Sequence, residues 1–192
     1  MKKIVPAVLM LLFTVTAIAQ DKQSLQQKAR EMYEVTVNND YDKILDYTYP
    51  KIFELVPREQ MKEILSSLFN SPELEVTILD TPPEFTYGDI KKINDGYYCL
   101  VQHNLSMKMV FAEKIAVDQQ AVLVQGMKKA MATDKVTFDE KENAITIHKR
   151  AEMIAVSDSY TVNKWSFANN NKEQGNFMNM LFSEAVINEL GL

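Results

Sequence analysis

Residues 97–111, with the sequence YYCLVQHNLSMKMVF, decide the fold class of this chain. Side chains at odd positions are apolar apart from His103, whereas the even positions include Gln102, Asn104 and Ser106. A polarity period of two is typical of a β-strand with one face turned toward a core. The segment therefore predicts a long strand whose odd face, including His103, points inward.

Shorter strands are predicted on both sides of this segment. Residues 74–79 alternate in polarity, residues 85–93 form a second strand, and residues 94–96 signal a hairpin turn. Four strands are predicted after it, at residues 136–138, 144–148, 152–157 and 161–167. The tripeptide His148-Lys149-Arg150 is interpreted as a basic turn at the surface.

Helical spacing of apolar residues precedes the strands and returns after them. Asp40 is a suitable N-cap for a helix from Tyr41. The clearest amphipathic stripe of the chain follows, and it consists of Met61, Ile64, Leu65, Leu68 and Phe69. Residues 118–131 predict a helical insertion, and residues 177–190 predict a terminal helix. This order predicts an α+β fold, with N-terminal helices packed on an antiparallel sheet and a short C-terminal helix.

Three segments resemble secreted members of the nuclear-transport-factor-2-like, or cystatin-like, superfamily. They are residues 46–56 (DYTYPKIFELV), the helix and strand of residues 61–79, and Lys164-Trp165-Ser166-Phe167 before the last helix. The resemblance implies a curved, cone-shaped sheet around a pocket at its open end. Relatives include ketosteroid-isomerase-like enzymes and dehydratases, and also ligand-binding and assembly modules, so membership alone selects no function.

The first residues have the pattern of a signal peptide. Lys2 and Lys3 precede the apolar run of residues 4–13, and Ala17-Ile18-Ala19 matches a cleavage site. We therefore predict a signal peptide over residues 1–19 and a single domain over residues 20–192. The expected location is secreted or periplasmic, with no lipid anchor and no stable membrane insertion after cleavage. The formal net charge of −5 argues against nucleic acid as a partner.

Composition excludes several classes of site. The closest two glycines are Gly88 and Gly96, so dinucleotide-binding, phosphate-binding and serine-elbow motifs are absent from the sequence. Two histidines and one cysteine, Cys99, are too few for a cysteine-rich zinc site. We expect no cofactor and no metal.

His103 is the candidate catalytic base. If the hairpin loop comprises residues 94–96 with Gly96 at a positive φ, then Tyr87 lies opposite His103 and Asp89 lies one rung away. A buried neutral imidazole with Tyr and Asp beside it suits proton transfer on a small carbonyl or hydroxyl compound. The alternative is a core histidine that is hydrogen-bonded to Tyr87 or to the backbone.

A second set of residues is a candidate for ligand binding. Tyr41, Tyr47 and Tyr49 are suited to gripping a flat ligand at a pocket rim, and Met107 to lining an adaptable apolar pocket. The alternative is that all four pack in the core. The leading hypothesis is a non-catalytic exported domain that binds a small apolar ligand or forms a homodimer. The competing hypothesis is an isomerase- or lyase-type enzyme that uses His103, Tyr87 and Asp89.

Overall fold

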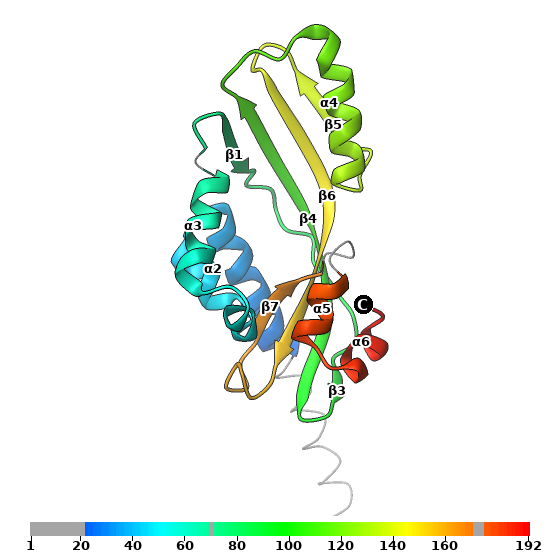
Figure 1. Ribbon diagram of the computed structural model, residues 1–192. Helices are drawn as coiled ribbons and strands as arrows, with labels where there is room; N and C mark the ends of the chain where they lie inside the picture. Colours follow the sequence, from blue (N-terminus) through cyan, green and yellow to red (C-terminus); the bar gives the residue numbers. More distant parts are fainter. Residues whose placement is uncertain (1–21, 70, 171–174) are drawn as a thin grey trace, which may run out of the picture.

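The computed structural model describes residues 22–69, 71–170 and 175–192, and it has the α+β fold that the sequence predicts (Figure 1). The helix of residues 22–37 comes first, followed by α2 (Tyr41–Tyr47), the short 3-10 helix η1 (Pro50–Glu54) and α3 (Arg58–Phe69). The side chain of Asp40 accepts a hydrogen bond from the Lys43 backbone N at 3.2 Å. This bond caps α2 as predicted, because it satisfies an amide that the helix leaves unpaired.

A seven-stranded antiparallel sheet follows, and its centre is the long pair of strands β4 and β6. Its strands are β1 (Leu74–Ile78), β2 (Thr86–Tyr87), β3 (Lys91–Ile93), β4 (Gly96–Phe111), β5 (Val136–Asp139), β6 (Ala144–Ser157) and β7 (Ser166–Asn169). β4 pairs with β6 along nearly its full length, and β1, β2 and β3 pair in turn with the other edge of β4. The predicted helical insertion is α4 (Val117–Ala130), and it lies beside β5 (Figure 1).

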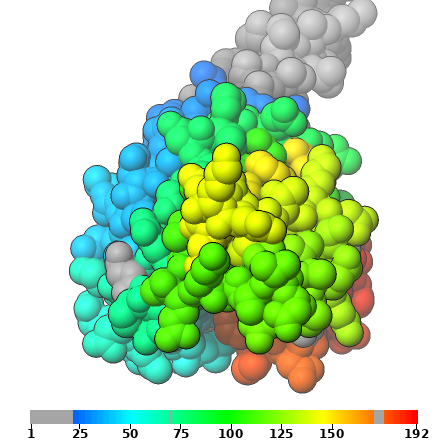
Figure 2. Space-filling model, turned by 90° about the horizontal axis from the view of Figure 1, so that it is seen from above, coloured from blue at the N-terminus to red at the C-terminus, as the bar shows by residue number. Residues whose placement is uncertain are grey.

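Both faces of the lower half of the sheet are covered. Cys99 and Val101 on the odd face of β4 pack with Leu25 and Ala29 of the first helix. The even face carries Tyr98, which packs against the C-terminal helices α5 (Gly175–Leu181) and α6 (Glu184–Leu190). At the other end of the sheet, a separate small core has three buried members, Val136, Ile145 and Ile147, which we call the distal core. Figure 2 shows this end from above, where α4, β5 and β6 (green to yellow) stand in front of the other elements.

The predicted hairpin register is wrong. Ile93 pairs with Gly96, so the turn consists of Asn94 and Asp95 alone, and Asn94 has the positive φ of 52°. A Cβ at Gly96 would lie 2.8 Å from ring atoms of Tyr98, so a side chain at this position would require that ring to move. A further one-residue shift between β3 and β2 places Tyr87 opposite Val101, and His103 pairs with Ala151 of β6.

Two other boundaries differ from the sequence prediction. The basic tripeptide 148–150 is not a turn, because β6 runs through it and Lys149 pairs with Leu105. The last strand begins at Ser166 rather than at Thr161, and the terminal helical stretch is divided into α5 and α6. In residues 148–150 polar side chains lie on a strand that is held by long-range pairing, which local polarity does not report.

The predicted signal peptide, residues 1–19, lies outside the described residues. Among the helices of the described part, none combines the length and apolar character that crossing a bilayer requires.

Candidate functional site

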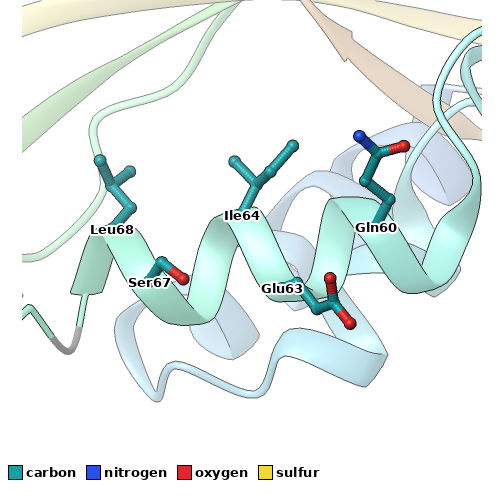
Figure 3. A pocket seen from close by; sticks show the side chains of 5 residues that line it. All are labelled: Gln60, Glu63, Ile64, Ser67 and Leu68. Atoms are coloured by element: carbon teal, nitrogen blue, oxygen red, sulfur yellow. The ribbon is translucent and has the colours of Figure 1, made fainter.

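An open hollow of about 570 Å³ lies over α3 (Figure 3). Its lining residues all come from this helix: Gln60, Glu63, Ile64, Ser67 and Leu68. Figure 3 shows Gln60, Ile64 and Leu68 on one side of α3, pointing into the space between the helix and the strands. The hollow therefore has an apolar floor with polar groups around it.

The amphipathic stripe of α3 is only partly used in packing. At one end Tyr41 stacks on Phe69, with ring centroids 6.0 Å apart. At the other end Met61 packs against the core cluster that includes Leu181 of α5. Between these ends Ile64 remains 50% exposed and Leu68 remains 57% exposed. An apolar stripe normally faces a core. The middle of this one faces the hollow instead.

A second hollow of about 240 Å³ lies where the first helix meets the segment before β2. It is lined by Arg30, Tyr33 and Glu34 of the helix and by Asp80 and Pro83 across from it, together with Val37 and Asn38. Within the described residues the side chains of Arg30, Glu34 and Asp80 make no hydrogen bond or ion pair. These three charged groups were missed by the sequence analysis because they form no recognisable spacing.

His103 lies behind this second hollow in an aromatic cluster. Its ring packs against Tyr33 and Phe85, with centroids 5.7 Å away in both cases. Its Nδ1 donates to the backbone oxygen of Asn104 at 2.9 Å, and burial holds the pKa of the imidazole below its ordinary value. The ring is therefore held neutral and enclosed by aromatic neighbours.

The three residues of the catalytic hypothesis are not joined by hydrogen bonds in the described structure. Tyr87 pairs with Val101, which is two residues from His103 on β4. The Phe85 ring packs against both Tyr87 and His103. Burial raises the pKa of the Tyr87 hydroxyl. Asp89 lies in the exposed segment between β2 and β3. His103 and Tyr87 thus share a neighbourhood, and the role of the trio in catalysis stays a prediction.

The three candidate tyrosines face three different neighbourhoods. Tyr41 stacks on Phe69, and Tyr47 donates to Glu31 Oε2 at 2.8 Å. Tyr49 is buried and donates to Asp158 Oδ2 at 2.8 Å. Burial and the Glu31 hydrogen bond raise the pKa of Tyr47 to about 12. These residues do not form one rim, so the structure gives them separate packing roles.

Met107 lies away from both hollows. It packs with other half-buried residues against the distal core, on the side of the sheet that α4 covers. Its place in an apolar cluster agrees with the expectation that it lines an apolar environment, but its ligand-binding role stays a prediction.

A histidine–serine contact was not anticipated. Ser106 is buried on β4, and its Oγ lies 2.8 Å from Nδ1 of the exposed His148 on β6. The only sequence signal was that both residues lie on predicted strands, and their pairing required the β4–β6 register. Because Ser106 is almost inaccessible, this pair is poorly placed to attack a substrate.

No family model and no curated protein sequence matches the chain. The functional argument therefore rests on the geometry of the chain itself.

Proposed function

We propose that this chain is an exported, non-catalytic domain that binds a small apolar ligand in the hollow over α3. The observation that carries the proposal is the exposure of Ile64 and Leu68 on the apolar stripe of α3, between the half-buried residues Met61 and Phe69. Removal of exposed apolar side chains from water by a bound ligand lowers the free energy.

The size and lining of the hollow favour a slender ligand with a polar end. A volume of about 570 Å³ lies within the range of small-molecule sites. Among the described residues that line it, the charged side chain is the Glu63 carboxylate, accompanied by the Gln60 amide and the Ser67 hydroxyl. An uncharged or cationic polar end therefore suits the hollow, and an anionic one is repelled by Glu63.

The enzyme hypothesis has less support from the geometry. His103 is surrounded by Tyr33 and Phe85, and neither described hollow is lined by His103 itself. A general base must lie within hydrogen-bond reach of the proton that it removes. The α3 hollow, in contrast, is open to solvent over its apolar floor.

Titration calorimetry with single-chain amphiphiles below their micelle concentration tests the proposal. Dodecyl maltoside and dodecyltrimethylammonium are expected to bind with one-to-one stoichiometry, and laurate more weakly than either. In the double variant Ile64→Ser/Leu68→Ser the affinity for dodecyl maltoside should fall by about tenfold or more, because apolar contact area is lost. Both side chains are half exposed, so the folded state should survive the change.

Val122→Ser is the matched control. Val122 is 73% exposed on α4, away from the hollow, and its replacement should leave the affinity unchanged. Equal binding by the double variant, or no binding by the parent chain, overturns the proposal. A ligand-free homodimer that the double variant dissociates also overturns it and favours the assembly hypothesis.

A further inference from the structure

Four methionines converge on the distal core from two different elements. Met107 and Met109 are two residues apart on β4, so both side chains leave the same face of the sheet. Their partners across the sheet are Ile147 and Ile145, which are fully buried members of that core.

α4 supplies the other two sulfur atoms. Met127 lies in the last turn of α4, and Met131 is the C-cap residue four positions later; both pack against the distal core. All four methionines are half buried, neither enclosed in the core nor fully in water. Two methionines from the strand and two from the end of the helix therefore pack against the same three buried residues.

Thioether sulfur is a soft, uncharged donor that prefers soft monovalent cations, and Cu(I) is the biological example. We propose that Met107, Met109, Met127 and Met131 form a binding site for Cu(I), and that Ag(I) occupies the same site. The cation enters already in its monovalent state, and each sulfur donates a lone pair. No electron or proton is transferred in this step.

Other ligand types do not account for such a site. In the part of the chain that the structure describes, no group of three His, Cys, Asp or Glu side chains is placed to hold a metal. The buried thiol of Cys99 belongs to a different core cluster, beside the first helix. The site also shares no residue with the α3 hollow, so it stands independently of the function proposed above.

Titration of the full chain with Ag(I), followed through the methyl signals of methionine, tests the proposal. We expect the signals of the four site methionines to shift together and to saturate at one equivalent. Met153 and Met178, which are buried in the other two core clusters, provide internal controls that should not move. Binding should persist at about pH 5, because thioethers carry no proton to lose, whereas histidine ligands would be protonated there.

Two conservative double variants, Met107→Leu/Met109→Leu and Met127→Leu/Met131→Leu, complete the test. Leucine keeps the volume and apolar character, so the fold is retained. Mutation of outer-shell partners already lowers metal affinity by about 10- to 100-fold. Removal of two ligands should lower Ag(I) affinity by at least that factor, and Met153→Leu should have no effect. Unchanged affinity in either double variant, an equal loss in Met153→Leu, or the absence of saturable binding overturns the proposal.

Discussion

The buried hydrogen bond between Tyr49 and Asp158 gives the sharpest stability prediction. Tyr49 is 2% exposed and Asp158 is 8% exposed, and the tyrosine hydroxyl donates to Oδ2 at 2.8 Å. The other carboxyl oxygen of Asp158 accepts from the Thr161 backbone N at 3.1 Å. The hydrogen bond between Tyr49 and Asp158 links the residue before η1 to the turn between β6 and β7.

Tyr49→Phe removes the hydroxyl but keeps the ring that stacks on Phe182 with centroids 5.6 Å apart. The carboxylate of Asp158 then loses one of the two hydrogen bonds that it accepts, while it stays buried. Hydrogen bonds to carboxyl groups contribute about 1.5–3 kcal/mol, and the loss is larger when the acceptor remains without water. We therefore expect the free energy of unfolding to fall by about 2–3 kcal/mol.

Urea unfolding at neutral pH measures this change. Tyr160→Phe is the control, because Tyr160 is about half exposed and its hydroxyl makes no hydrogen bond among the described residues. It should change the free energy of unfolding by no more than about 0.5 kcal/mol. A loss below about 0.5 kcal/mol for Tyr49→Phe would refute the claim that this bond stabilises the fold.

Three other properties follow from the charges and burial of single residues. The Lys28 hydrogen bond holds the pKa of Glu31 at about 2, against an ordinary value of 4.5. The stability gained from this carboxylate is therefore complete above about pH 4.5 and is lost as the pH falls to about 2. The parent chain should exceed Glu31→Gln in free energy of unfolding by about 1 kcal/mol or less, because the pair is part-exposed. This difference should vanish between about pH 4.5 and about pH 2, and a constant difference would contradict the prediction. Burial lowers the pKa of His103, so its contribution to stability is lost as the pH falls below 6.5, and its NMR titration midpoint should lie below 6.5; a midpoint at or above that value refutes the burial argument. Burial raises the pKa of Cys99 to about 11, so a thiol reagent at neutral pH should react only as the chain unfolds, whereas rapid labelling of the native chain would be inconsistent with the structure.

The sequence predicted the fold class because its strongest signals are periodic. The alternation in residues 97–111 is β4, the pattern of residues 118–131 is α4, and Asp40 caps α2. Each of these depends on neighbours in sequence, which is why local pattern was sufficient.

The hairpin register could not be obtained in the same way. It is accompanied by a close approach of the Tyr98 ring to Gly96, a tertiary contact that the local sequence pattern does not report. The two-residue turn shifts the pairing by one residue, and the segment between β2 and β3 shifts it by one more, so Tyr87 lies opposite Val101 rather than opposite His103.

The candidate site was predictable only in part. The stripe containing Ile64 and Leu68 was evident, but its exposure depends on how α2, α3 and the sheet are arranged. Likewise, the methionines were candidates for lining an apolar pocket, but which of them pack against the same core depends on tertiary packing.

Intermolecular NMR contacts between bound dodecyl maltoside and selectively labelled methyl groups test the central claim most directly. The account predicts nuclear Overhauser contacts from the alkyl chain to the methyl groups of Ile64 and Leu68, and none to the exposed control Val122. Contacts at Val122 alone, or no contact at either α3 residue at saturating amphiphile, would contradict the assignment of the α3 hollow as the binding site.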